Sequence, residues 1–271
     1  MPLDREEYVE QAYFFRTLRE RMQQSMSTQD LLMAARQEIL ATTQLPYAID
    51  FMASELRLTG GFATAMARLP HYFTPFQSYV VAEAEKAEGR FDFRIALEIL
   101  ESEAEYRAKG TSPQGIFLFQ FETLCRNRLG YDRGLDAVAG DPSFDQNWRE
   151  WIIMVRRQVG LVDFADMIYV RSELYRKTRK KAEKPILFGE KEGRIAMANR
   201  RKDPRYLVSA LQRHLGYPAV PQPRPEDSQR HLLPALQRRI ERIETRMGLL
   251  EEEHRGGINL ARFYAEKEGK E

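Results

Sequence analysis

Helix start signals recur along this chain, and they constrain its fold more than any other feature of the sequence. At several places a small polar residue stands directly before a proline, a pair that suits the N-cap and the first helical position. Glycines that suit helix ends follow about one helix length later. The start pairs are Thr74-Pro75, Ser112-Pro113, Asp141-Pro142 and Asp203-Pro204, and the glycines include Gly89, Gly130 and Gly216. We therefore expect an all-α fold with a multi-helix body.

Details of these signals predict individual helix ends. Asp4 with Glu7, and Thr74 with Gln77, have the spacing of a capping box. Pro46 suits the first turn of a helix that ends at the Gly60-Gly61 pair. The Thr74 and Ser112 starts are separated by roughly the length of a helical-hairpin repeat. Stacked helical hairpins are therefore one arrangement of the body, although such starts are common to helices in general.

Large apolar side chains place the core in the first two thirds of the chain. The sequence has 271 residues, of which 43% are hydrophobic, and its 15 Phe, 12 Tyr and 2 Trp are concentrated before residue 176. This composition is sufficient to bury a core. We predict an aromatic-rich helical body over residues 1–180, a connecting segment over 181–227 and an amphipathic helical arm over 228–271.

The predicted connecting segment is first basic and then rich in proline. Residues 185–197 suit a small β-hairpin or an extended linker, and Asp203-Pro204 begins one short helix that ends at Gly216. Residues 217–227 include four prolines, which is typical of a semi-rigid extended spacer.

The charge is distributed unevenly, although the net charge is only +2. Residues 171–205 contain thirteen Lys and Arg against five Asp and Glu, whereas residues 1–170 contain eighteen basic and twenty-five acidic side chains. We call residues 171–205 the basic belt. Such a cluster can neutralise phosphates and attach to RNA or DNA in a salt-dependent way. The candidate anion-binding residues are Arg176, Lys177, Arg179, Lys180, Lys181, Arg200, Arg201 and Lys202.

Two other interpretations of the basic belt require no nucleic acid. The belt suits a solvated tether, and it also suits a segment that folds back on the acidic body. Only Tyr175, Phe188 and Tyr206 supply aromatic rings near its charges, so single-stranded bases would have few stacking partners.

The C-terminal arm has the most regular apolar spacing in the chain. Apolar residues three and four positions apart form a short heptad pattern, which indicates a helix that self-associates, docks on a partner or packs on the body. We expect a protein partner or a homo-oligomer through residues 228–254. The predicted contact residues are Leu233, Leu236, Ile240, Ile243, Met247 and Leu250.

Known catalytic and metal-binding patterns are not evident. The four histidines form no zinc-protease motif. Glu251 and His254 form one Glu-x-x-His motif, whereas a ferritin-like di-iron site needs two such motifs and further carboxylates. Cys125, the only cysteine, suits a small core residue better than a nucleophile, although Arg126 and Arg128 flank it. We therefore predict no catalytic residue, no metal site and no cofactor.

The sequence contains no apolar run long enough for a transmembrane helix and no visible signal peptide. We expect a cytoplasmic protein without a membrane partner. The function we predict is that of a non-enzymatic interaction or adaptor protein, with the arm for association and the basic belt for an anionic surface. The alternatives are an RNA- or ribosome-associated factor, and an enzyme whose pocket is built from residues distant in sequence.

Overall fold

A computed structural model describes residues 2–22, 28–86, 91–178 and 184–223 of the chain. Thirteen helices and no strand occur in these ranges, which confirms the all-α prediction. Residues 1–222 form one compact unit. The heptad residues Leu233, Leu236, Ile240, Ile243, Met247 and Leu250 lie outside the described residues.

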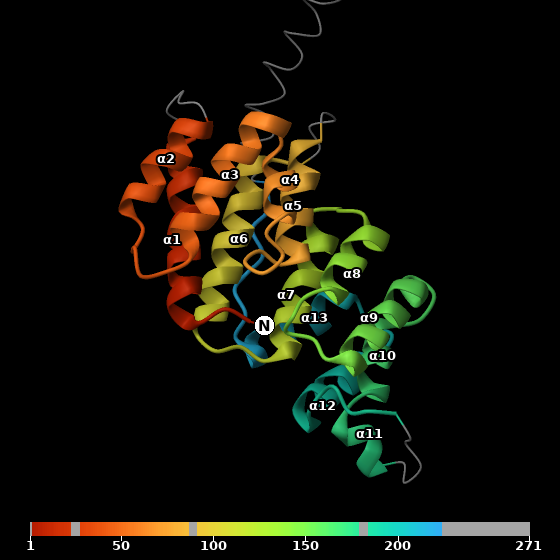
Figure 1. Cartoon of the computed structure of the whole chain (residues 1–271). Coiled ribbons are helices and arrows are strands. Elements are labelled where there is room, and N and C mark those ends of the chain that lie inside the picture. Colours follow the sequence, from red (N-terminus) through yellow and green to blue (C-terminus); the bar gives the residue numbers. More distant parts are fainter. Residues whose placement is uncertain (1, 23–27, 87–90, 179–183, 224–271) are drawn as a thin grey trace, which may run out of the picture. The chain divides into compact units, whose positions relative to one another are not determined.

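Most of the helices are short, and turns of a few residues join many of them (Figure 1). Their bounds are α1 Arg5–Arg21, α2 Thr28–Glu38, α3 Leu45–Thr59, α4 Phe62–Ala67, α5 Pro75–Glu85, α6 Phe93–Ala108, α7 Pro113–Arg126, α8 Tyr131–Ala139, α9 Gln146–Gln158, α10 Phe164–Val170, α11 Glu173–Thr178, α12 Glu190–Ala198 and α13 Pro204–Leu215.

Several helix ends form as local sequence predicts. Thr74 and Gln77 make a complete capping box at the start of α5: the Gln77 amide donates to Thr74 Oγ1 at 3.3 Å, and the Thr74 amide donates to Gln77 Oε1 at 3.0 Å. Ser112 caps α7 through the Gly115 amide. Gly60 ends α3 in the left-handed conformation, which glycine adopts without steric cost.

Helix α1 begins after Asp4, as predicted, but the capping box is absent, and the helix start predicted at Asp141 is wrong. Asp4 makes no side-chain cap on α1, and Glu7 instead accepts hydrogen bonds from the Gln44 amide at 2.7 Å and the Tyr72 hydroxyl at 3.0 Å. Asp141 does not open a helix, because it is buried in the core. Asp145 caps α9 instead, by accepting from the Trp148 amide at 2.9 Å.

The sequence predicts that Gly130 ends a helix, but Gly130 instead directly precedes the first residue of α8. Helix α7 ends earlier, at Arg126, and the turn after it contains Arg128 with a positive φ of 53°. The Tyr79 hydroxyl donates to the Gly130 carbonyl at 2.8 Å and so attaches this turn to α5.

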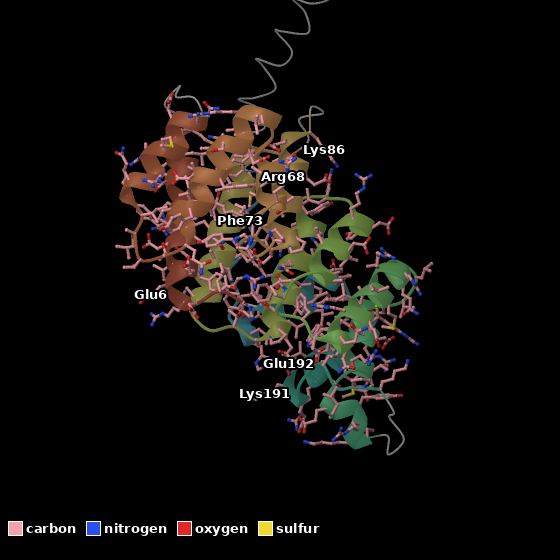
Figure 2. All side chains as sticks on the ribbon, in the orientation of Figure 1. Glu6, Arg68, Phe73, Lys86, Lys191 and Glu192 are labelled. Carbon is pink, nitrogen blue, oxygen red and sulfur yellow. The ribbon has the colours of Figure 1, made fainter. Side chains whose placement is uncertain are left out.

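The core runs through the whole described unit. Helices α1 and α6 lie side by side and share the most extensive contact (Figure 1). Phe14 and Phe15 of α1 are fully buried, and Phe73, before α5, packs near Phe15 with ring centroids 6.3 Å apart. Figure 2 labels Phe73 among the side chains of the body. Around Phe117 of α7 a second aromatic group includes Trp148 and Trp151.

The described part of the predicted connecting segment packs on the body. Phe188 is 1% exposed, and its ring meets Trp148 and Trp151 edge to face at centroid distances of 5.3 and 5.1 Å. Residues 190–198 form α12 rather than a hairpin or linker. Two buried apolar side chains, Leu187 and Phe188, therefore attach this basic stretch to the body.

Close packing continues on both sides of Phe188. A Cβ atom at Gly193 of α12 would lie 2.4 Å from Ser172 Oγ, so only glycine allows the helix to approach this closely. Part of the predicted proline-rich spacer also packs on the body. Tyr217 is buried and donates to Glu122 at 3.0 Å, Val220 is buried, and Asn127 Nδ2 donates to the Pro221 carbonyl at 3.2 Å.

Candidate functional site

Backbone hydrogen bonds join the start of the basic belt, at residues 171 and 173, to residues 187 and 188. The Glu173 amide donates to the Phe188 carbonyl at 2.9 Å, and the Leu187 amide donates to the Arg171 carbonyl at 2.9 Å. The chain after Lys184 therefore runs beside the start of α11. Because Phe188 is buried against Trp148 and Trp151, the belt is part of the folded unit.

Lys177 forms ion pairs that link α11 to α12. Its ammonium lies 2.5 Å from Glu190 and 3.1 Å from Glu173. Arg194, one turn along α12, also pairs with Glu190. Hydrogen bonds to Glu190 and Glu173 raise the pKa of Lys177, and those from Lys177 and Arg194 lower the pKa of Glu190. Lys177 and Arg194 are therefore partly neutralised within the protein.

Arg200 and Arg201 attach the turn between α12 and α13 to α10. Arg200 pairs with Asp166, and its guanidinium carbon lies 5.7 Å from the ring centroid of Tyr169. The Arg201 amide donates to Asp163 Oδ2 at 2.6 Å. The two aspartates come from the acidic part of the chain, so the belt contacts that part directly.

On α11, on α12 and in the turn after α12, four exposed cations of the basic belt have no carboxylate partner among the described residues. These are Arg176, Lys191, Arg201 and Lys202, and all four side chains are exposed. Figure 2 labels Lys191 beside Glu192 on α12. We call these four residues the unpaired cations. They occur at the end of α11, in the first turn of α12 and in the α12–α13 turn.

The predicted anion-binding residues therefore divide into three groups. Arg176, Arg201 and Lys202 are exposed and unpaired, as binding requires, whereas Lys177 and Arg200 make contacts within the protein. Sequence reasoning did not select Lys191. The remaining three, Arg179, Lys180 and Lys181, lie outside the described residues.

An exposed aromatic ring follows the α12–α13 turn. Tyr206, in the first turn of α13, is 66% exposed, and its amide donates to the Asp203 carbonyl at 3.0 Å. Asp203 also caps the helix and pairs with Arg205 at 2.6 Å. Tyr206 follows Lys202 by four residues in the sequence, and the Asp203 cap fixes the backbone between them.

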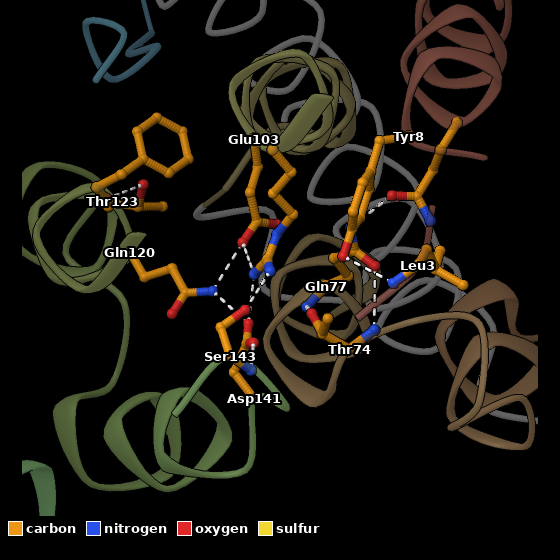
Figure 3. A network of polar contacts seen from close by, with 12 residues as sticks. Leu3, Tyr8, Thr74, Gln77, Glu103, Gln120, Thr123, Asp141 and Ser143 are labelled. Carbon is orange, nitrogen blue, oxygen red and sulfur yellow. Dashed lines mark hydrogen bonds and ion pairs between the residues drawn. The ribbon is translucent and has the colours of Figure 1, made fainter. Parts of the chain in front are cut away.

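A second group of charges is buried in the body (Figure 3). Arg107 Nη2 donates to Glu103 Oε1 at 2.8 Å and also to Asp141. Gln120 Nε2 donates to Glu103 Oε1 at 2.7 Å and to Asp141 Oδ2 at 2.9 Å. Ser143 completes the group, because its hydroxyl accepts from Arg107 Nη1 at 2.8 Å. We call these five residues the buried charge network.

The buried charge network joins α6, α7 and the loop before α9. Burial raises the pKa of Asp141, but the interactions with Arg107, the Ser143 amide and the Gln120 side chain lower this pKa by more. The net effect is a pKa below the ordinary value of an aspartate. The Asp141 carboxylate therefore stays ionised next to Arg107. Glu103 and Asp141 are 0% exposed, and the interactions among the five residues account for a structural role.

Cys125 and the described histidines show no arrangement that indicates catalysis. Burial raises the pKa of the Cys125 thiol, which disfavours the reactive thiolate. The His214 ring lies 3.1 Å from Glu192. Across the described ranges, no group of three or more His, Cys, Asp or Glu side chains is arranged to hold a metal ion.

Among the pockets between described residues, two have volumes near 500 Å³, which is enough for a small molecule. One, of about 470 Å³, lies between α4 and α5, and its lining is apolar except for a few polar groups that include Tyr79. Another, of about 480 Å³, lies where α1 meets the end of α6, and its lining includes Arg5, Arg16 and Lys109. Arg16 is paired with Glu101 at 2.6 Å and with Glu105.

Part of this arrangement was accessible to sequence reasoning. The pairs Glu173–Lys177 and Glu190–Arg194 have the i,i+4 spacing at which opposite charges meet on a helix, so two of the neutralised cations could have been identified. The Arg200–Asp166 pair joins residues 34 positions apart, and no local pattern indicates it.

Comparison with known proteins adds no relative to this description. No family model matches the chain, and neither the curated proteins nor the solved structures include a detectable match. Within the described residues, no helix is both long enough and apolar enough to cross a membrane.

Proposed function

We propose that this chain is a non-enzymatic interaction protein that attaches to an anionic surface through its basic belt and associates with a protein partner, or with itself, through residues 228–254. The observation that supports the first part is the division of the belt's cations. Lys177 and Arg194 pair with carboxylates inside the belt, Arg200 pairs with Asp166 of the body, and the unpaired cations stay exposed. A preformed cationic surface loses less entropy on binding than a tether does.

A second candidate function is that of an RNA-associated factor. Tyr206 favours it, because an exposed ring near Arg201 and Lys202 could stack on an unpaired base while the cations contact phosphates. The heptad segment would then be a secondary feature of the protein.

The proposal is tested with two triple variants of equal net charge. The first, Arg176→Gln with Arg201→Gln and Lys202→Gln, removes unpaired cations. The second, Lys177→Gln with Arg194→Gln and Arg200→Gln, removes cations that already have carboxylate partners. Binding of heparin, a single-stranded RNA and duplex DNA is titrated with each full-length variant between low and physiological salt.

We expect the first variant to flatten the plot of log affinity against log salt by about 0.7–0.9 per lost phosphate contact. The second variant should change this slope less, and should lower thermal stability instead. Equal loss in both variants would mean that only net charge matters, and no binding at low salt would remove the anionic surface from the proposal. Tighter binding to RNA than to heparin, weakened by Tyr206→Ala, would favour the RNA-associated function.

A further inference from the structure

Helix α3 has an apolar face that no other described element covers. Tyr47 is 75% exposed, Leu58 is 79% exposed, and Phe51 and Ser54 between them are exposed as well. These four positions are spaced by four, three and four residues, which places them on one stripe along the helix. The opposite face of α3, with Leu45, Ile49 and Met52, is fully buried in the core. Helix α3 is therefore apolar on two sides.

The exposed stripe is self-complementary. Its spacing reads the same in both directions, with the midpoint between Met52 and Ala53. A two-fold axis at that point would place Tyr47 opposite Leu58 of a second copy, and Phe51 opposite Ser54 of that copy. The large ring of Phe51 would then face the small side chain of Ser54, which lets the facing side chains interdigitate. The Ser54 hydroxyl already donates to the Asp50 carbonyl at 3.0 Å, so it would leave no unsatisfied donor in the contact.

The charges beside the stripe match in the same arrangement. Asp50 and Arg57 lie one heptad apart on the same flank, and an antiparallel helix pair brings such equivalent flanks together. Arg57 would meet Asp50 of the second copy, and the pairing would occur twice. Arg57 makes no ion pair with a described residue. The Asp50 Oδ1 atom lies 2.5 Å from Arg36 Nε, so the second carboxylate oxygen, Oδ2, can accept from another donor.

The apolar surface extends from α3 to α2 on this flank. The ion pair of Arg36 with Asp50 places α2 directly beside α3. Met33 lies three residues before Arg36 on the same side of α2 and is 42% exposed. A contact between two copies would therefore cover more than one helix on each.

We infer that α3 forms a homodimer interface in which two copies pack antiparallel about a two-fold axis beside Met52 and Ala53. The partner is a second copy of this chain, because spacing, side-chain size and flanking charge all match under one two-fold operation. This interface is separate from residues 228–254 and does not depend on the proposed function.

Disulfide trapping in the full-length chain tests the register. In a Cys125→Ala background, Tyr47→Cys and Leu58→Cys are combined in one chain. The two Cα atoms of one copy are separated by about 16 Å along the helix, which excludes a disulfide within the chain. Under mild oxidation, we expect this double variant to form a covalent dimer that a reductant reverses. Each single variant should stay uncrosslinked, and a mixture of the two singles should crosslink.

A matched control uses two exposed positions elsewhere, Leu161→Cys with Tyr206→Cys, which should not crosslink. Charge supplies the second measurement, by sedimentation across concentration. Arg57→Asp creates two like-charge contacts and should weaken the dimer at least about tenfold, whereas Arg57→Lys should not. A monomeric wild-type chain, or a dimer that fails to crosslink through positions 47 and 58, would overturn the inference. In the second case association through residues 228–254 would still stand.

Discussion

At the scale of single residues, Arg107 has the most demanding environment, because it is buried between two carboxylates, Glu103 and Asp141. Arg107→Met leaves both carboxylates without their cation, and such a loss in a protein interior costs about 3–5 kcal/mol of unfolding free energy. Ser143→Ala removes one neutral hydrogen bond of Arg107 and should cost about 1 kcal/mol. Urea denaturation at neutral pH measures both, and similar costs would contradict the structural role of Arg107.

The same environment predicts how stability depends on pH. The pKa of Asp141 is lower in the folded protein than in the unfolded chain. Its contribution is therefore fully present above the unfolded value of about 3.9, and is lost as pH falls through the lower folded value. Asp141→Asn removes this contribution, so the unfolding free energy of the variant should fall less steeply below about pH 4. Parallel urea titrations from pH 5 to pH 3 compare the two slopes, and identical slopes would contradict the prediction.

Sequence reasoning reaches single residues only where their partners are local. Glu103 and Arg107 are one helical turn apart, so their pairing follows from the i,i+4 rule. Asp141 stands before a proline and has the pattern of a helix cap, yet its partner Arg107 is 34 residues away. A local motif and a long-range ion pair use the same carboxylate, and only the folded structure decides between them.

At the scale of elements, Phe188 attaches the second half of the basic belt to the body. Phe188→Ala removes a ring that packs on Trp148 and Trp151, and should cost about 3–5 kcal/mol. Tyr206→Ala, at an exposed position, should change stability by less than about 0.5 kcal/mol. Thermal unfolding followed by tryptophan fluorescence measures both variants. Equal melting temperatures would show that α12 and α13 are not part of the cooperative unit.

The helix ends whose capping contacts are local were predictable, whereas α12, which lacks a clear start signal, was not. Thr74, Gln77 and Gly60 act as the sequence indicates, because their contacts lie within a few residues. Helix α12 has a glycine inside it and charged residues around it, so its sequence resembles a linker. Its position depends on the close approach of Gly193 to Ser172, which no local pattern reveals.

At the scale of the whole molecule, the described unit reaches residue 222 rather than the predicted boundary at 180. The residues that extend it are few and widely spaced in a charged stretch, so composition alone suggests a connecting segment. They include Leu187, Phe188, Leu207, Leu211, Tyr217 and Val220, all of them buried. The all-α class followed from local helix start and end signals, whereas the extent of the unit depends on these isolated contacts. The role of residues 228–254 stays a prediction.

The burial of Phe188 has a thermodynamic consequence for any ligand of the basic belt. The arrangement of cations on the basic belt exists only in the folded unit. A ligand that binds this arrangement and has no affinity for the unfolded chain therefore raises the free energy of unfolding of the body. The gain is about 2.7 kcal/mol when the free ligand is at a hundred times its dissociation constant. Ligand binding to the belt and folding of the aromatic core are thus linked equilibria. A substitution that weakens the packing of Phe188 on Trp148 and Trp151 therefore lowers the apparent affinity of the belt for the ligand, although the substituted residue does not contact the ligand.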